Sequence, residues 1–403
     1  MTTPLAMTLP SNPLERPIGV AVAGFGWMGR VHAQAYSRVL HHFPDLVLHP
    51  HLQAVADDVP GRAEAAAARF GFATASRDWR ELLSDDRVQA VSVTAPNFLH
   101  REMGVALARA GKHLWIEKPV GLTSADARAV AEAGAAAGVT VVVGFNYRNA
   151  PAVQTARRLI DGGELGTITH ARIRLFSDYA AHPDGALSWR FERSRGGSGV
   201  LGDLASHAAD LAWFLLGDIA EVSADTAVFL DRRPIPTAAT TGHGRATGGP
   251  LGQVENEDYL AALLRFGSGA RGVLEASRVA VGEQNNYGVE IHGTRGSLWW
   301  DFRRMGELRT SLGSSYADQS VTTRFVGPGD GDYAAFQPGA ANSMSFDDLK
   351  VIEAADFLTS IDTGTQHGAG LADAVRSATV LDAMAESART RAWVSIDRGA
   401  PTG

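Results

Sequence analysis

The chain has 403 residues, a formal net charge of -7 and no cysteine. Its length favours two domains, and its hydrophobic content of 45% and charged content of 20% are those of a soluble globular protein. The acidic balance argues against a nucleic-acid surface, and the lack of cysteine excludes disulfides, a thiolate nucleophile and a thiolate metal site. These properties fit a cytoplasmic protein. The longest apolar runs, such as residues 129–143, carry charge and glycine and are too mixed to span a membrane.

The first 16 residues are polar and interrupted by proline. They lack the basic start and apolar core of a secretory signal, so we expect a disordered tail. From residue 17 to 147, short apolar runs rich in β-branched residues alternate with helical segments. This alternation is typical of a doubly wound parallel sheet.

A glycine-rich turn, Gly24-Phe25-Gly26-Trp27-Met28-Gly29, follows the first expected strand and precedes an expected helix at residues 30–40. The first glycine permits a tight turn, the second lets the backbone approach a pyrophosphate, and the third lets helix and strand pack closely. The helix N-terminus supplies N–H donors to the anion. The pattern predicts a dinucleotide site, and the alternative is a simple strand-to-helix turn.

The second expected strand, Leu52–Ala56, ends at two acids, Asp57 and Asp58. An acid here accepts hydrogen bonds from the adenosine ribose hydroxyls and repels a 2′-phosphate, which favours NAD over NADP. The acid comes later than usual because a connection rich in His and Pro, His41–His51, precedes the strand. We expect this connection to be a surface loop and not a metal site. The alternative is that the two acids form only a solvated turn.

Two further expected strands end in polar segments that contain proline. Residues 88–94 run into Ala95-Pro96-Asn97, and His113–Ile116 runs into Glu117-Lys118-Pro119. Pro119 cannot extend a strand ladder, so these side chains stand at the edge of the sheet. Ligands of open α/β sheets bind outside this edge, although a solvated turn is the simpler interpretation. The cofactor contacts that we expect here are Thr94, Ala95, Pro96, Asn97, His100, Glu117 and Lys118.

After about residue 148, strands follow one another without intervening helices, which predicts an antiparallel sheet. Such a sheet has one face covered by helices and one free face, and a free face with bulky side chains is typical of an oligomer surface. The expected strands are 168–176, 222–230, 258–266, 270–279, 287–292 and 297–302. We also expect a long surface loop at 232–252, a mostly irregular segment at 303–342, and closing helices at 346–361 and 371–389.

Asp203 and His207 lie four residues apart in an expected helix at 201–216, so they share one face. Histidine titrates near neutral pH and can accept the proton of a hydroxyl group. A carboxylate one turn away can orient the imidazole or hold a second hydroxyl, and we expect Asp210 on the polar face as well. These residues alone leave open an ordinary Asp–His surface pair.

Taken together, the segments Gly24–Gly29, Thr94–Asn97, Glu117–Pro119 and the pair Asp203/His207 resemble the glucose-fructose oxidoreductase / inositol dehydrogenase / MocA family (Gfo/Idh/MocA). The resemblance implies a Rossmann domain at residues 17–147. It also implies a second α/β domain at 148–403 with a large open, mostly antiparallel sheet that forms dimers or tetramers. Within the family, the chain looks most like levoglucosan dehydrogenases and related sugar 3-dehydrogenases. The segments that resemble this subgroup are 145–153, 187–191, 197–203 and 286–294.

The family resemblance implies NAD-dependent oxidation of a secondary hydroxyl of a sugar, anhydrosugar, glycoside or cyclitol, without a metal. In this interpretation His207 is the general base, Lys118 holds the reacting oxygen, and Asp203 binds a neighbouring hydroxyl or orients His207. Whether Lys118 or His207 is the formal base is left open. Further expected substrate contacts are Tyr147, Arg148, Asp178, Trp189 and Arg190.

The same motifs fit three other activities. One is an NADH-dependent ketoreductase that runs the reaction in reverse. Another is a non-catalytic NAD-binding regulator, and the third is NAD-dependent glycoside cleavage through a transient ketone. The segment Ser177-Asp178-Tyr179 stands where the subgroup has a Gln-Asp-Trp-like sequence, so the particular sugar is not fixed by the resemblance.

Overall fold

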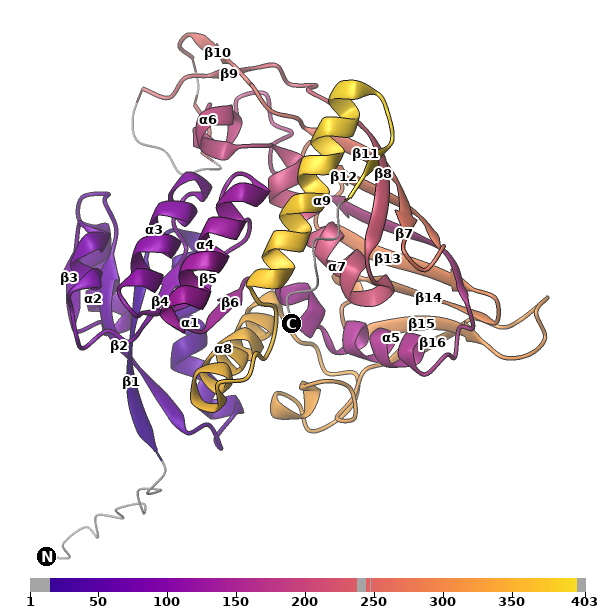
Figure 1. The fold of residues 1–403 in the computed structure, drawn as a ribbon, viewed down its shortest axis with the longest axis horizontal. Coiled ribbons are helices and arrows are strands. Elements are labelled where there is room, and N and C mark those ends of the chain that lie inside the picture. The colour runs from indigo at the N-terminus through magenta and orange to yellow at the C-terminus, as the bar shows by residue number, and fades with distance from the viewer. Residues whose placement is uncertain (1–14, 238–243, 247, 397–403) are drawn as a thin grey trace, which may run out of the picture.

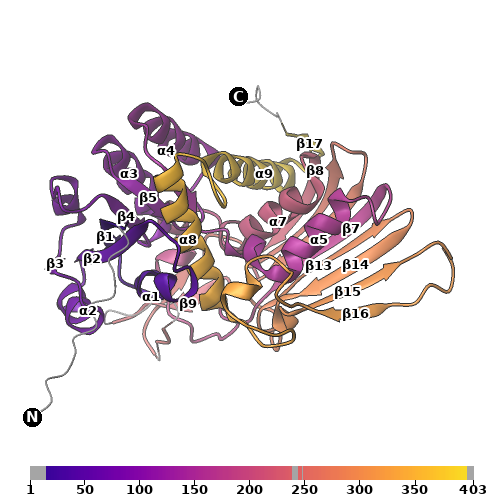
Figure 2. The same cartoon turned by 90° about the horizontal axis from the view of Figure 1, so that it is seen from below.

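The computed structural model describes residues 15–237, 244–246 and 248–396, so most of the expected N-terminal tail lies outside the described residues. Two sheets stand side by side, and the last two helices of the chain lie between them (Figures 1 and 2). The boundary of the tail differs from our expectation, because Arg16 already begins the first strand and pairs with Leu48.

The first unit alternates strands and helices, as expected. Its elements are β1 (Arg16–Ala23), α1 (Trp27–His42), β2 (Leu48–Ala56), α2 (Arg62–Phe70), β3 (Thr74–Ser76), η1 (Trp79–Leu83), β4 (Ala90–Val93), α3 (Asn97–Arg109), β5 (His113–Ile116), α4 (Ser124–Ala137) and β6 (Val141–Val143). The strands form a parallel sheet in the order β3-β2-β1-β4-β5-β6. The order reverses beside β1, which is where a doubly wound sheet binds its ligand.

Both faces of this sheet are buried, which explains the continuous apolar runs of its strands. In β5, Leu114 and Ile116 pack among residues of α3 and α4. Trp115 points to the opposite face, where its ring meets Tyr36 of α1 and Phe357 near the end of the chain. Successive strand residues thus anchor the two helical layers on either side.

The connection expected at 41–51 is mostly regular structure. α1 continues to His42, and β2 begins at Leu48 rather than at Leu52. Pro50 fits inside β2 because β3 pairs only with Ala54–Ala56, which leaves that side of the strand open at the proline. The four histidines of this segment therefore lie in elements rather than in a loop: His41 and His42 in α1, His49 and His51 in β2.

The second unit is built on a nine-stranded sheet. Its elements are η2 (Asn146–Asn149), α5 (Pro151–Asp161), β7 (Ile168–Phe176), η3 (Trp189–Phe191), α6 (Arg193–Gly196), η4 (Leu201–Ala205), α7 (Ser206–Leu216), β8 (Ile219–Ala227), β9 (Arg232–Pro234), β10 (Leu251–Gln253), β11 (Tyr259–Phe266), β12 (Arg271–Ser277), β13 (Asn286–Gly293), β14 (Gly296–Asp301), η5 (Phe302–Arg304), β15 (Glu307–Leu312), β16 (Thr322–Phe325), η6 (Tyr333–Ala335), α8 (Phe346–Thr363), α9 (Leu371–Thr390) and β17 (Val394–Ser395).

The strand order of this sheet is β16-β15-β14-β13-β7-β12-β11-β8-β17. It is mostly antiparallel, as expected, with β7 and β12 paired in parallel. Alternate residues of β7 are buried in the core that α5 and α7 cover (Figure 2). The other face carries exposed side chains, among them Leu263 and Val273, which are opposite each other on β11 and β12.

Two segments that we expected to be irregular contain short strands. The ends of the loop expected at 232–252 pair as the short ladder β9–β10, and Arg233 in that ladder is fully buried. The segment expected to be irregular at 303–342 contains β15 and β16, which extend the large sheet by two strands. Residues 238–243 and 247 lie outside the described residues.

The helices α8 and α9 come last in the chain but pack on the first unit. Val351 and Phe357 of α8 belong to the same apolar cluster as Val20 of β1. Just before α9, the carbonyl of Ala369 accepts a hydrogen bond from the backbone N–H of Val143 at 2.8 Å. The C-terminal segment therefore fixes how the two sheets stand relative to each other.

None of the described helices is long and apolar enough to cross a lipid bilayer.

Candidate active site

The glycine turn between β1 and α1 fits a bound diphosphate. Gly24 has a φ of +89°, and a Cβ there would lie 2.6 Å from Cα of Ala95. A Cβ at Gly29 would lie 2.4 Å from the carbonyl oxygen of Gly24. By contrast, a Cβ at Gly26 would meet nothing within 4 Å, so open space lies in front of this residue at the N-terminus of α1. The first and third glycines thus close the turn, and the second faces the space that an anion requires.

The other residues of the turn line its two sides. Phe25 is buried against Phe70 and Phe72. Trp27 is 58% exposed and stacks on Phe346 at the start of α8, with 5.4 Å between ring centroids. Met28 is half-buried. Trp27 and Met28 therefore remain candidates for contact with a dinucleotide, whereas the ring of Phe25 supports the turn from within.

Asp57 is tied to the glycine turn. Its Oδ2 accepts a hydrogen bond of 2.7 Å from the backbone N–H of Phe25, and its Oδ1 accepts one of 3.0 Å from Val59. Arg62 lies 3.2 Å away and pairs with the same carboxylate. Asp58 is exposed. Asp57 is therefore held beside the glycine turn, whereas Asp58 lies at the surface.

The end of β4 closes over the same turn. The hydroxyl of Thr94 donates to the carbonyl of Gly24, and Ala95 packs against that glycine. Pro96 caps α3, and Asn97 is the half-buried first residue of that helix.

We expected His100 to contact the cofactor, but its ring is fully occupied by the protein. It is 1% exposed, and each ring nitrogen lies 2.7 Å from a backbone carbonyl oxygen, of Ala95 and of Pro119. His100 thus holds the ends of β4 and β5 together.

Lys118 stands at the end of β5, and the peptide bond that follows it to Pro119 is cis. Its Nζ donates to the backbone carbonyl of Asp203 at 3.0 Å and lies 3.6 Å from Oδ1 of the same residue. The side chain is 13% exposed. The ammonium group therefore reaches from the first unit to the second and remains accessible to a small molecule.

Glu117, the residue before Lys118, turns its carboxylate away from solvent. Nε2 of His32 lies 3.0 Å from its Oε1, and Nζ of Lys350 donates to the same oxygen at 2.5 Å. Burial raises the pKa of Glu117, but Lys350 and His32 outweigh burial and hold this pKa well below its usual range. Sequence reasoning missed His32 and Lys350, because nothing near them in the sequence marks partners so far apart along the chain.

The segment that carries Asp203 and His207 is not one continuous α-helix. Residues Leu201–Ala205 form a π-helical turn, and α7 begins only at Ser206. A π-turn rotates the side chains that precede it relative to those that follow, and such turns are frequent at functional sites. The apolar side chains Leu204, Ala208, Leu211 and Leu215 of this segment are buried.

His207 lies 7% exposed beside Tyr147, whose ring it meets edge-on with 4.6 Å between centroids. Burial, together with the charge of Lys118, lowers the pKa of His207 well below 6.5. The imidazole is therefore neutral at physiological pH, which is the form that accepts a proton.

Asp203 is surrounded by donors from both units. Its Oδ2 accepts a hydrogen bond from the hydroxyl of Tyr179, and Arg190 lies 3.7 Å from its Oδ1. Burial and the charge of Asp203 raise the pKa of Tyr179 well above 10, so its hydroxyl stays a donor. Sequence reasoning selected Asp178 and missed its neighbour Tyr179, although both follow β7 directly, where alternation places one of them inward.

The remaining expected substrate residues divide into two groups. Tyr147 is buried against His207, and burial raises its pKa well above 10. Trp189 is half-buried, with the guanidinium of Arg190 4.6 Å from its ring centroid. Asp178 is half-buried beside Tyr179. These residues surround Asp203 and His207 or adjoin residues that do.

Arg148 does not join this group. Its Nε donates to Asp210 at 2.7 Å, and a second guanidinium nitrogen donates to Asp373 at 3.1 Å. We expected Asp210 on a polar helix face, but it is 3% exposed because it neutralises Arg148 inside the protein. Tyr147 and Arg148 are adjacent in the chain, and the tight helical turn η2 sends them in different directions.

Among the described residues, no group of three or more His, Asp or Glu side chains is arranged to hold a metal ion.

A dinucleotide-binding turn next to a lysine, a neutral histidine and an aspartate defines an oxidoreductase that transfers hydride between a nicotinamide and an alcohol or ketone.

Two family models match the chain. Residues 18–145 match the model described as an oxidoreductase family with an NAD-binding Rossmann fold, and residues 153–299 match the GFO/IDH/MocA C-terminal domain. The chain belongs to the GFO/IDH/MocA family of NAD-binding oxidoreductases. This result confirms the family, the fold class and the cofactor that the sequence predicted.

The chain is similar to levoglucosan dehydrogenase of Pseudarthrobacter phenanthrenivorans, with 35% identity over 94% of this chain and 98% of that protein. It is also 30% identical to scyllo-inositol 2-dehydrogenase (NAD(+)) of Bacillus subtilis, over 71% of this chain and 74% of the relative. A solved structure of levoglucosan dehydrogenase in complex with NADH and levoglucosan superimposes with a TM-score of 0.89 and 34% identity, covering 95% of this chain and 100% of that one.

Proposed function

We propose that the protein oxidises a secondary hydroxyl of a sugar, anhydrosugar, glycoside or cyclitol to a ketone with NAD. The observation that carries this proposal is the reach of Lys118 across the two units, 3.0 Å from the carbonyl of Asp203, one turn before a buried neutral His207. The names of the similar proteins, a levoglucosan dehydrogenase and an inositol dehydrogenase, support the substrate class.

Bound NAD supplies the hydride acceptor at the carboxyl ends of β1, β4 and β5. His207 takes the hydroxyl proton of the substrate, since its imidazole is neutral and lies close enough to Lys118 for that charge to lower its pKa. Lys118 donates a hydrogen bond to the reacting oxygen and stabilises the negative charge that develops on it. Asp203, fixed by Tyr179, holds a neighbouring hydroxyl. Tyr147, Asp178, Trp189 and Arg190 complete the proposed substrate wall.

The test is a panel of levoglucosan, glucose, a methyl glucoside and two inositols, each assayed for NADH absorbance with NAD and with NADP. We expect turnover of one class with NAD and stoichiometric NADH. Conversion of a glycoside without net NADH would indicate cleavage through a transient ketone instead. Binding of NADH without turnover of any panel member or of the corresponding ketones would contradict the proposal and favour a non-catalytic regulator.

A homo-oligomer that forms through the outer face of the large sheet is part of the same proposal. Leu263 and Val273, 52% and 38% exposed, face each other across β11 and β12 on that side. Exposed apolar pairs of this kind favour association. Light scattering of the parent and of L263K/V273E tests it, since the variant should dissociate. A cytoplasmic location stays a prediction.

A further inference from the structure

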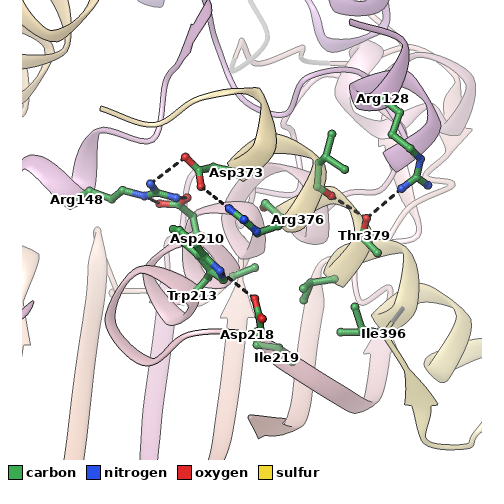
Figure 3. Close-up of a pocket in the computed structure, with 14 residues that line it drawn as sticks. Arg128, Arg148, Asp210, Trp213, Asp218, Ile219, Asp373, Arg376, Thr379 and Ile396 are labelled. Carbon is green, nitrogen blue, oxygen red and sulfur yellow. Dashed lines mark hydrogen bonds and ion pairs between the residues drawn. The ribbon is translucent and has the colours of Figure 1, made fainter. Parts of the chain in front are cut away.

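A cavity lies apart from the proposed active site. It measures about 430 Å³ and is enclosed by α4, α7, α9 and the start of β8 (Figure 3). From α7, it is lined by Ala209, Asp210 and Trp213, whereas neither His207 nor Lys118 is among the 14 described residues that line it. Its volume is in the range of small-molecule sites.

Most of the wall is apolar. The aliphatic side chains that line it are Ala209, Ile219, Val375, Val380 and Ile396. Arg148 enters from the side, 5.1 Å from the ring centroid of Trp213, and Arg376 lies 4.5 Å from the same ring. The indole is therefore fixed between cations, and the aliphatic side chains supply the surface that an apolar ligand body can cover.

The acceptors at the inner end of the cavity are already used. Asp210 accepts two hydrogen bonds from Arg148. Asp373 accepts from Arg148 at 3.1 Å, from Arg376 at 3.2 Å and from the backbone N–H of Gly370 at 2.9 Å. Burying an ion pair in this way leaves these carboxylates no need of a further cation. Asp218 accepts the indole N–H of Trp213 at 3.1 Å and lies across the cavity from Arg128 (Figure 3).

Two guanidinium groups that line the cavity are not used to the same extent. A guanidinium group has five N–H donors and no acceptor. Arg128 donates to two hydroxyls, of Ser124 and of Thr379, and no carboxylate pairs with it among the residues that the structure describes. Arg376 has a single acidic partner, Asp373, and its side chain is 46% exposed. Thr379, which accepts a hydrogen bond from Arg128, follows Arg376 by one turn of α9, so both arginines line the cavity beside this helix (Figure 3).

We propose that this cavity binds a small amphipathic organic anion. Its carboxylate would accept hydrogen bonds from Arg128 and Arg376, and its hydrocarbon or aromatic body would cover Ile219, Val380 and Ile396. The site is independent of the dehydrogenase activity, and it shares α7 with His207. A ligand there also approaches Arg148, whose chain neighbour Tyr147 packs on His207.

The probe for the test is 4-phenylbutyrate, titrated calorimetrically into the full-length protein in the presence of saturating NADH. We expect one molecule to bind per chain without displacing NADH. The double variant R128Q/R376Q should weaken binding by about tenfold or more, because it removes both charge-assisted hydrogen bonds to the carboxylate. The control variant R109Q removes an exposed arginine from the last turn of α3 and should bind like the parent.

Two further probes test the ligand class. The neutral analogue 4-phenylbutanol should bind more weakly than 4-phenylbutyrate, and inorganic phosphate should not compete. Absence of 4-phenylbutyrate binding at millimolar concentration, or equal binding to R128Q/R376Q, would overturn the site. Competition by phosphate at similar affinity would overturn the amphipathic ligand class. Unchanged NADH affinity of the double variant shows that it has folded.

Discussion

Lys350 and Glu117, 233 positions apart in the sequence, form a buried ion pair with 2.5 Å between Nζ and Oε1. Lys350 also donates to Glu353 at 2.8 Å, and its side chain is 1% exposed. Glu117 directly precedes Lys118, so the pair joins α8 to the strand end that carries the proposed oxygen-binding lysine. Helix α8 thereby supports the end of β5 and, with it, the proposed active site.

Replacing Lys350 by Met should destabilise the protein by about 3–5 kcal/mol, because it leaves Glu117 buried without its main cation. Urea unfolding followed by circular dichroism measures the loss. The double variant E117Q/K350M removes the uncompensated charge as well and should recover much of the stability. If K350M has the same free energy of unfolding as the parent, the Lys350–Glu117 pair does not hold α8 in place.

Lowering the pH should destabilise the protein already at pH values above those at which carboxylates normally titrate. Burial lowers the pKa of His32 from 6.5 to about 4, although the hydrogen bond with Glu117 opposes this shift. The unfolded chain therefore binds a proton between these pH values and the folded chain does not, so stability is lost as pH falls from about 6.5 towards 4. The titration of His32 alone should lower the free energy of unfolding by roughly 3 kcal/mol across this pH window.

Urea unfolding of the parent and of H32Q at several pH values tests the role of His32. The glutamine does not titrate, so H32Q should show a pH slope smaller by about one proton in this window. Buried His100 and His207 also have lowered pKa values and will leave part of the slope in place. Identical slopes in parent and H32Q would mean that His32 is not buried in its neutral form.

Loss of the proposed base at His207 should lower kcat by about 10²–10⁴ in H207A and leave NADH affinity largely unchanged. Because burial and Lys118 lower the pKa of His207, the parent should also keep its activity as pH falls through 6.5. The matched control is H170A, which removes an exposed histidine from the outer face of the large sheet. Stopped-flow turnover and NADH titration measure both quantities, and a kcat in H207A close to that of the parent would exclude the assigned role.

Removal of the carboxylate at Asp57 should weaken NAD and relax discrimination against NADP. In D57S, Arg62 loses the partner that now lies 3.2 Å away, and a free guanidinium can bind a 2′-phosphate. We expect the preference for NAD over NADP to fall by about tenfold or more. The control D58S changes the neighbouring acid, which is exposed. Equal coenzyme ratios in D57S and the parent would assign the preference to other residues.

The features that the sequence predicted are those with a local signature. The glycine turn and the proline-closed strand ends each depend on residues within one or two turns of chain. The four-residue spacing of Asp203 and His207 is of the same kind. Such patterns mark these residues as candidates, whereas the distance between Lys118 and Asp203 depends on how the two units pack.

The features that the sequence did not predict depend on contacts between distant segments. His32, Glu117 and Lys350 meet only after α8 has packed against the sheet, so no local pattern marks them. The π-turn before α7 is equally invisible, because the composition of Leu201–Ala205 does not distinguish a π-turn from an α-helical turn. β15 and β16 were missed because both strands are short and show little alternation, and every residue of the edge strand β16 is exposed.

Arg148 and Arg190 test the difference between local patterns and contacts among distant segments. The sequence predicted substrate contact for both arginines, but their surroundings in the structure differ. Arg148 has an 8% exposed side chain between two aspartates, whereas Arg190 is 26% exposed beside Asp203. R148M should lower the free energy of unfolding by about 3–5 kcal/mol, because Asp210 and Asp373 lose their shared cation. R190M should change stability by less than about 1 kcal/mol and raise KM for the sugar. If R148M instead raised the sugar KM at unchanged stability, Arg148 would belong to the substrate site after all.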